Sequence, residues 1–226
     1  MLASVLVLLA SSPFIIPSAE SPSDQSNPDV LSETIQDSPL ATDELETLEV
    51  KGRAPKTGYS RDEFGSGWAS IDGCDTRNII LQSNLQEVEL AEDDCVVLSG
   101  ELDDPYTGTQ IAFVRGRTTS GGVQIDHVVA LSDAWQKGAQ LLDFSDRVVF
   151  ANDPLNLLAV DGPANQQKGD SDAASWLPSN KSFRCQYVAR QIAIKSKYSL
   201  WVTDAEKSVM KRVLNGCGDQ RLPIET

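Results

Sequence analysis

The stretch GGVQIDHVVALSDAW, residues 121–135, contains the only histidine of this 226-residue chain. An imidazole titrates near neutral pH, so His127 can take a proton from water. Asp126, directly before it, offers the kind of oxygen ligand that Mg²⁺ and Mn²⁺ prefer. The β-branched run after two glycines predicts a strand, and neighbouring side chains of a strand point to opposite faces. Both residues therefore reach one site only at a strand end or a bend; the plainer alternative is a histidine without a chemical role.

A second polar group lies in NLLAVDGPANQQKGD, residues 156–170. NLLAV predicts a short buried strand, and the segment after it predicts a helix that begins near Asp161, with a proline in its first turn. The polar side chains of this strand–turn–helix unit are Asn156, Asn165, Lys168 and Asp170.

The two stretches together resemble the HNH endonucleases. The wider resemblance, from about residue 59 to residue 217, is to secreted bacterial proteins of the HNH endonuclease family. It implies a ββα-metal core without zinc knuckles, here with a long insertion between the two stretches. The stretches that show the resemblance are GCDTRN, DPYTG, IDHVVALSDAWQKGA, FANDPLNLLAV and NQQKGD. Within them, the residues that match the family pattern are, in order, Asp126, His127, Asn156, Asn165 and Lys168.

This resemblance implies roles for four residues. His127 is expected to be the general base, and Asn156 to brace the loop that holds it. A plain turn-capping role for Asn156 is an equal alternative. Asp126 and Asn165 are expected to hold one divalent cation, Mg²⁺ or Mn²⁺, which would keep several waters.

Four cations are candidates for contacts with substrate phosphates. Lys168 and Arg147 are the first choice, and the alternative for each is a solvated surface charge. The resemblance adds Arg61 and Arg77 from the N-terminal half of the chain.

The implied activity is hydrolysis of phosphodiester bonds in DNA, with RNA as the alternative substrate, by a secreted monomer. The net charge is −14; residues 1–50 hold nine of the 33 acidic side chains and none of the 19 basic ones, which leaves −5 for the remainder. Nucleic-acid binders are usually basic, so we expect weak, salt-sensitive binding without sequence specificity. Two alternatives stay open: a non-catalytic binding or surface protein on a nuclease scaffold, and a metal-dependent phosphoesterase for smaller esters.

The chain divides into three segments. Residues 1–19 read as a signal peptide, because the apolar run is short for a membrane anchor, which is the alternative. No stable membrane association is expected after its cleavage. Residues 20–50, rich in Ser, Pro, Asp and Glu, are expected to form a disordered linker. Residues 51–226 are expected to form one α+β domain: the HNH ββα-metal core, extra N-terminal strands, C-terminal helices and two disulfides.

Several further elements must position the two polar stretches. RNIILQSNL predicts a helix with Thr76 as its N-cap, and CVVLSGEL and TQIAFVRG predict two strands joined by a turn. SDAWQKGAQLLDFSDRVVF predicts one helix. CQYVARQIAIKSKY and TDAEKSVMKRVLNGC predict two C-terminal helices, the second with Thr203 and Glu206 as a capping box.

Four cysteines in an exported chain suit two disulfides. Of the three possible pairings we expect the local one, Cys74–Cys95 and Cys185–Cys217. No CxxC pair occurs, so a zinc ribbon is not supported. Neither pair lies beside His127 in the sequence, and we expect no catalytic role for either.

Overall fold

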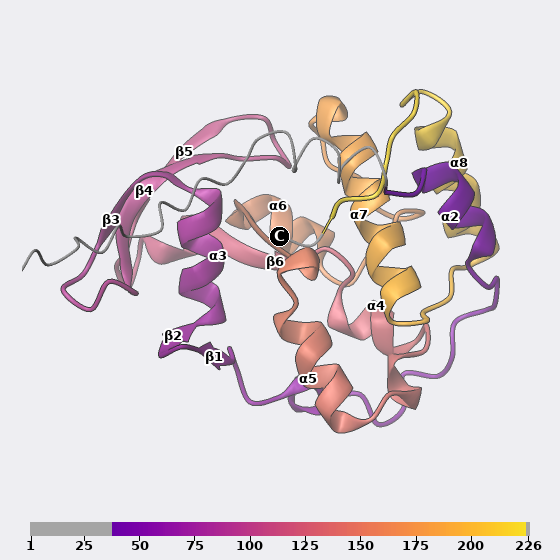
Figure 1. Cartoon of the computed structure of the whole chain (residues 1–226), viewed down its shortest axis with the longest axis horizontal. Coiled ribbons are helices and arrows are strands. Elements are labelled where there is room, and N and C mark those ends of the chain that lie inside the picture. Colours follow the sequence, from indigo (N-terminus) through magenta and orange to yellow (C-terminus); the bar gives the residue numbers. More distant parts are fainter. Residues whose placement is uncertain (1–37, 225–226) are drawn as a thin grey trace, which may run out of the picture.

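The computed structural model describes residues 38–224, which form an α+β fold with small antiparallel sheets (Figure 1). Two disulfides link its segments. The expected fold class is thus confirmed. The expected signal peptide, residues 1–19, and residues 20–37 of the expected linker lie outside the described residues.

Two antiparallel strands followed by a helix form the middle of the molecule (Figure 1). His127 at the end of the first strand pairs with Leu157 at the start of the second. Gly162 opens the helix where a Cβ atom would lie 2.1 Å from the Gly121 carbonyl oxygen, so only glycine allows this close approach. The elements are β6 (Val123–His127), β7 (Leu157–Asp161) and α6 (Gly162–Lys168).

Two helices fill the long insertion between β6 and β7, where the sequence predicts one. The chain breaks at Gly138, whose φ of 123° other residues rarely adopt. A Cβ atom there would also meet the Trp201 ring at 3.2 Å. The helices are α4 (Leu131–Trp135) and α5 (Phe144–Asn152), with a 3₁₀ turn, η3 (Ala139–Leu141), between them.

The N-terminal half supplies a three-stranded sheet, a helix and a small hairpin. The N-cap of the helix is Asp75 rather than the expected Thr76, because the Asp75 carboxylate accepts from the Asn78 amide at 2.8 Å. The first strand of the sheet was not expected; it is short and its pairing is irregular. The elements are β1 (Ser70–Ile71), β2 (Cys74–Asp75), α3 (Thr76–Asn84), β3 (Gln86–Leu90), β4 (Val97–Asp103) and β5 (Gln110–Val114).

The two C-terminal helices form as expected, α7 (Arg184–Lys197) and α8 (Asp204–Leu214). Thr203 caps the second one, since its hydroxyl accepts from the Glu206 amide at 3.2 Å. Both helices contribute to the largest apolar cluster of the core.

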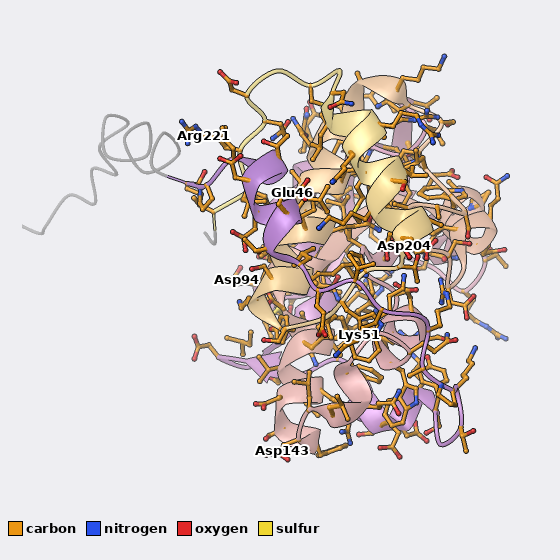
Figure 2. The ribbon with its side chains drawn as sticks, turned by 90° about the vertical axis from the view of Figure 1, so that its right-hand side faces the viewer. Glu46, Lys51, Asp94, Asp143, Asp204 and Arg221 are labelled. Carbon is orange, nitrogen blue, oxygen red and sulfur yellow. A yellow bond between two sulfur atoms is a disulfide. The ribbon has the colours of Figure 1, made fainter. Side chains whose placement is uncertain are left out.

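Helix α2 (Ala41–Thr47) lies against α7 and α8, although the sequence predicts disorder up to residue 50. Its apolar side chains, Ala41 and Leu45, are buried together with Leu48 just after it. Figure 2 shows α2 beside α8, and there Glu46 accepts a 2.6 Å contact from Lys211. An acidic segment thus orders because another part of the chain covers its one apolar face.

A group of charges is buried beneath these helices. The Lys137 ammonium lies 2.8 Å from the nearest oxygens of Asp133 and Asp172 and 2.6 Å from Glu206. The Lys195 ammonium contacts Asp133 and Glu206, and Arg53 contacts Asp133 and Asp172 from the half-exposed side. The charges balance, which makes such burial tolerable.

Both expected disulfides are present, Cys74–Cys95 and Cys185–Cys217. The second joins the start of α7 to the chain just after α8, as two antiparallel helices allow. None of the helices within residues 38–224 is long and apolar enough to cross a membrane.

Candidate functional site

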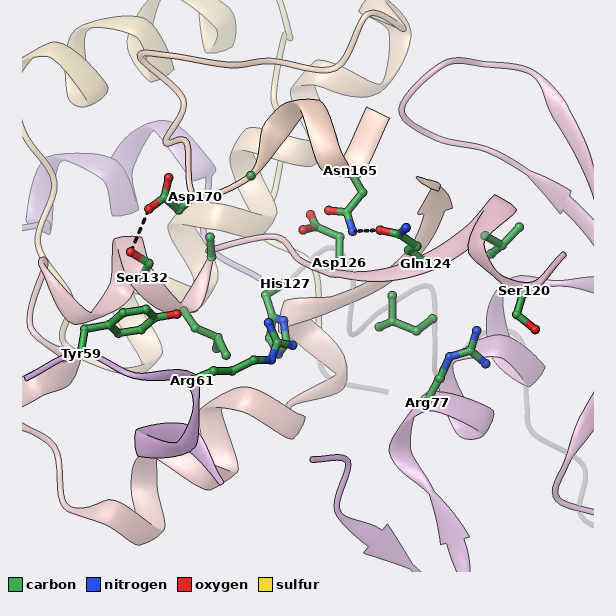
Figure 3. Close-up of a pocket in the computed structure, with 15 residues that line it drawn as sticks. Tyr59, Arg61, Arg77, Ser120, Gln124, Asp126, His127, Ser132, Asn165 and Asp170 are labelled. Carbon is green, nitrogen blue, oxygen red and sulfur yellow. Dashed lines mark hydrogen bonds between the residues drawn. The ribbon is translucent and has the colours of Figure 1, made fainter. Parts of the chain in front are cut away.

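A polar pocket of about 480 Å³ opens along β6 (Figure 3). Five of the residues proposed from the sequence line it: Arg61, Arg77, Asp126, His127 and Asn165. Side chains also reach it from α3, from α4, and from the segment that contains the 3₁₀ turn η1 (Arg61–Phe64). The pocket therefore joins both polar stretches of the sequence with part of the N-terminal half.

His127 is the last residue of β6, and one ring nitrogen is already used. Its Nε2 lies 2.9 Å from the Ala151 carbonyl oxygen at the end of α5. A carbonyl oxygen only accepts, so Nε2 carries the proton in the neutral ring and Nδ1 keeps a free lone pair. Trp68 stacks on the imidazole, with ring centres 5.8 Å apart and planes 7° from parallel. The imidazole ring is thus contacted at its Nε2 edge by Ala151 and on one face by Trp68.

Burial favours the neutral form of the His127 imidazole. Burial lowers its pKa to about 3; the bond to Ala151 opposes this shift, while the charges of Arg61 and Lys168 add to it. An anion bound in the pocket would act against the two cations and raise the pKa again. The free base form therefore exists throughout the neutral range.

Asp126 lies on the opposite face of β6 but lines the same pocket, because His127 ends the strand. Its Oδ1 accepts from the Lys168 ammonium at 2.9 Å and its Oδ2 from the Tyr106 hydroxyl at 2.5 Å. Burial raises the pKa of this carboxyl, and the Lys168 charge and the two side-chain bonds offset only part of that rise.

Asn156 lies behind the pocket and closes the loop after His127. Its Oδ1 accepts from the Val129 amide at 2.9 Å, its Nδ2 donates to the Val129 carbonyl at 3.3 Å, and its own carbonyl accepts from the Val128 amide at 2.8 Å. The side chain is fully buried. These contacts fix the backbone directly after His127.

Asn165 projects from α6 into the pocket. Its amide nitrogen donates to Gln124 at 2.9 Å, which turns its carbonyl oxygen toward the Asp126 carboxylate (Figure 3). One carboxylate and one amide oxygen that face each other are a donor pair for a hard cation that keeps most of its water. Within residues 38–224, no group of three or more His, Cys, Asp or Glu side chains is placed to hold a metal ion.

Lys168 and Arg147 do not line the pocket. Lys168 is fully buried and donates to Asp126 and, at 2.8 Å, to the His127 carbonyl oxygen. Arg147 donates to the Glu63 and Leu142 carbonyl oxygens and pairs with the Glu63 carboxylate at 3.1 Å. Contacts of these two cations with substrate phosphates therefore stay predictions, and the geometry gives them other partners.

Arg61 and Arg77 both reach into the pocket, from η1 and from α3 (Figure 3). Neither guanidinium forms a salt bridge or a hydrogen bond with any residue in the described part of the chain. Burial, and then the charge of Arg115, lower the pKa of Arg77. Without carboxylate partners among the described residues, these two arginines offer contacts to an anion, beside the Asp126 and Asp170 carboxylates that also line the pocket.

Two residues that hold the site were missed from the sequence. Trp68 and Tyr106 contact His127 and Asp126 but lie in other elements of the fold. Tyr106 belongs to the DPYTG segment, whose resemblance could have singled it out. Trp68 carried no signal beyond its residue type.

The fold and the pocket define a disulfide-bridged α+β protein with a free imidazole nitrogen, two unpaired guanidiniums and a pair of oxygen donors in one cavity. A model of the C-terminal domain of GmrSD restriction endonucleases matches residues 75–213. This match covers more than half of the chain, so the protein belongs to that family and is nuclease-related.

A relative in Arthroderma benhamiae is described as an uncharacterized secreted protein. It is 41% identical over 176 residues, which cover 76% of this chain and 82% of the relative. No solved structure matches the chain. The secreted relative and the two disulfides agree with an oxidising, extracellular setting.

Proposed function

We propose that this protein is an exported, metal-dependent endonuclease of the HNH type that hydrolyses phosphodiester bonds of DNA, with RNA as the alternative substrate. The observation that carries the proposal is the free Nδ1 of His127 in a pocket with two unpaired arginines. The nuclease-related family and the order β6, β7, α6, which a ββα-metal core requires, support it.

In the proposed reaction His127 is the general base. Its Nδ1 takes a proton from a water molecule as the water oxygen bonds to phosphorus and the bond from phosphorus to the 3′ oxygen breaks. The leaving oxygen is protonated from solvent, which gives a 5′-phosphate and a 3′-hydroxyl. Asn156 supports this step because its side chain bonds to the Val129 backbone and so holds the loop after His127. This is the bracing role expected from the sequence.

The donor pair of Asp126 and Asn165 is the proposed site of one divalent cation, Mg²⁺ or Mn²⁺. When bound, such a cation supplies charge neutralisation for the phosphate and the leaving oxygen. The bonds from Lys168 and Tyr106 leave lone pairs on the Asp126 oxygens, so the carboxylate can still act as a ligand. The Lys168 ammonium competes for that charge, which favours weak cation binding.

Arg61 and Arg77 are the proposed phosphate contacts, in addition to the predicted Lys168 and Arg147. Both guanidiniums line the pocket, and a planar guanidinium matches two phosphate oxygens. The domain as a whole is not basic, so we propose weak, salt-sensitive binding of nucleic acid by a monomer. Export rests on the apolar start of the chain, the disulfides and the secreted relative.

Incubation of the purified protein with supercoiled plasmid and Mg²⁺ or Mn²⁺, with and without EDTA, tests the proposal. We expect nicked and linear DNA only where the free metal is present. Intact plasmid under all conditions would favour the non-catalytic scaffold instead, and cleavage of a small phosphodiester without cleavage of plasmid would favour the phosphoesterase.

A further inference from the structure

We propose that the hairpin of residues 68–77, which the Cys74–Cys95 disulfide fastens to the larger sheet, is a positioning element that holds His127 and Arg77 for the reaction. The inference rests on the proposed function. It means that hydrolysis depends on the oxidised state of this one disulfide, whereas Cys185–Cys217 contributes stability alone.

The hairpin begins at the His127 ring. Trp68 is stacked nearly parallel on the imidazole, and both side chains also line a smaller pocket of about 120 Å³. With Nε2 bonded to Ala151, the Trp68 ring on one face of the imidazole restricts its tilt. The direction of Nδ1 therefore depends on where residue 68 lies.

The residue after Trp68 is anchored to the same helix end as His127. The Ala69 amide donates to the Asn152 side chain at 2.8 Å, and Asn152 directly follows Ala151, the partner of His127. The Ala69 carbonyl accepts from both the amide and the hydroxyl of Thr76, at 2.8 and 2.9 Å. One end of the hairpin is thus tied to α5 and the other to the start of α3.

The strands of the hairpin are too short to hold this arrangement alone. β1 and β2 have two residues each, and Ile71 is 47% exposed. Asp72 and Gly73, both with positive φ, form the tight turn between them. A two-stranded ribbon of this size is marginal in water, so a covalent link near its tip supplies what hydrogen bonds do not.

The disulfide fastens the hairpin to the larger sheet. Cys95 lies just before β4, and its carbonyl oxygen accepts from Gln82 of α3 at 2.7 Å. Arg77 lies three residues after Cys74, in the first turn of α3. Its guanidinium lies over the Phe113 ring of β5, 5.9 Å from the ring centre. The bridge is thus a covalent tie between the sheet and the helix turn that carries Arg77 into the pocket, beside the bond from the Val97 amide to the Asn78 side chain at 3.1 Å.

Cys185–Cys217 offers a matched control. It links residues 32 positions apart, against 21 for Cys74–Cys95, and joins the start of α7 to the chain after α8. Neither of its cysteines lines the pocket of His127. Both bridges stabilise the fold by restricting the unfolded chain. Only the first one is bonded into a segment that touches the site.

The decisive experiment compares Cys74→Ser/Cys95→Ser with Cys185→Ser/Cys217→Ser, well below the melting temperature of each. We expect plasmid cleavage by the first variant to fall about ten- to hundredfold, since small displacements of reacting groups have effects of this order. The second variant should stay within about twofold of the parent protein, as removal of a distant constraint leaves the site geometry unchanged.

The single histidine gives a readout that does not depend on activity. With any affinity tag removed, the imidazole NMR signals come from His127 alone. Loss of the Cys74–Cys95 bridge should move these signals, because the Trp68 ring no longer covers the imidazole in the same way; loss of Cys185–Cys217 should not. Trp68→Ala should show the same shift and the same loss of cleavage, and Trp68→Phe, which keeps an aromatic face, should restore part of both.

The outcomes separate this inference from the proposed function. Equal activity of the two disulfide variants with unmoved His127 signals would overturn the positioning role. If the first variant fails to fold, the comparison of Trp68→Ala with Trp68→Phe decides instead: equal activities and unmoved signals would overturn it. A parent protein without nuclease activity would overturn the proposed function, and the His127 signals would still test the positioning.

Discussion

The Lys168 ammonium binds both the Asp126 carboxylate, at 2.9 Å from Oδ1, and the His127 carbonyl oxygen, at 2.8 Å. Lysine and aspartate are both buried, so the pair forms inside the protein, directly behind the pocket. The end of α6 thereby holds the end of β6, where the two central residues of the site lie.

Replacement of this lysine should therefore act on stability. Lys168→Met leaves the Asp126 carboxylate buried without its cation, and breaking a buried pair in this way costs about 3–5 kcal/mol. Urea unfolding measures the loss. Lys181→Met, at an exposed lysine in the 3₁₀ turn before α7, is the control and should change little. Equal free energies of unfolding for the two variants would show that Lys168 is not a structural partner of Asp126.

The general base is tested by His127→Ala. We expect plasmid cleavage to fall by about 10²–10⁴-fold, the usual contribution of a general base. Circular dichroism should show a folded protein, because most of the core packs elsewhere. Cleavage within a few fold of the parent rate would assign the base to another group.

The cation site is tested by titration of Mn²⁺ into Asn165→Ala. Loss of the amide oxygen should weaken binding, and higher metal concentrations should restore part of the activity, since a neutral ligand contributes less than a carboxylate. Gln124→Ala removes the hydrogen-bond partner of Asn165 but no proposed ligand, so its affinity should fall less. Asp126→Ala should weaken binding most. Unchanged affinity in all three would place the cation elsewhere.

The two pocket arginines should control the binding of nucleic acid. Arg61→Met and Arg77→Met should each raise the KM for DNA and lower the salt dependence of binding by about one released ion, as expected for a lost phosphate contact. Arg212→Met, at an exposed arginine of α8 outside the pocket, is the control. A salt slope that stays the same in both pocket variants would argue against phosphate contacts there.

Acid should destabilise the protein through the buried charges around Lys137. Burial of Asp172 raises the pKa of its carboxyl, but bonds and charge from Lys137 and Arg53 prevail and lower it to about 2. A carboxyl with a lowered folded pKa adds stability above its unfolded value, near 3.8, and loses it as the pH falls toward 2. The loss should be about 2 kcal/mol, at roughly 1.4 kcal/mol for each pKa unit.

Urea unfolding at several pH values across this interval measures the effect. Asp172→Asn should be less stable at neutral pH and should show a shallower dependence between about pH 4 and pH 2. A slope identical to that of the parent protein would mean that other carboxylates cause the acid sensitivity.

Several features followed from short stretches of sequence. The pairing of Cys74 with Cys95 and of Cys185 with Cys217, and the helices α7 and α8, are as expected. Spacing and capping residues act over a few positions, so they can be read without the fold. The sequence also predicted a strand around His127; the structure ends this strand at His127, which explains how Asp126 reaches the same pocket.

Other features depended on contacts between distant segments. A lysine looks the same in a sequence whether water or a buried carboxylate surrounds it, so the inward direction of Lys168 could not be foreseen. Helix α2 was not predicted for a similar reason. Its apolar face is short, and it is buried only by α7 and α8, which lie near the other end of the sequence. The sequence by itself determined which groups could do chemistry, and it favoured the cysteine pairing that the structure confirms. Only the tertiary structure decided that Trp68 stacks on the His127 ring and that Arg61 and Arg77 have no ion-pair partner among residues 38–224, because stacking and ion pairing depend on distances between residues far apart in the chain.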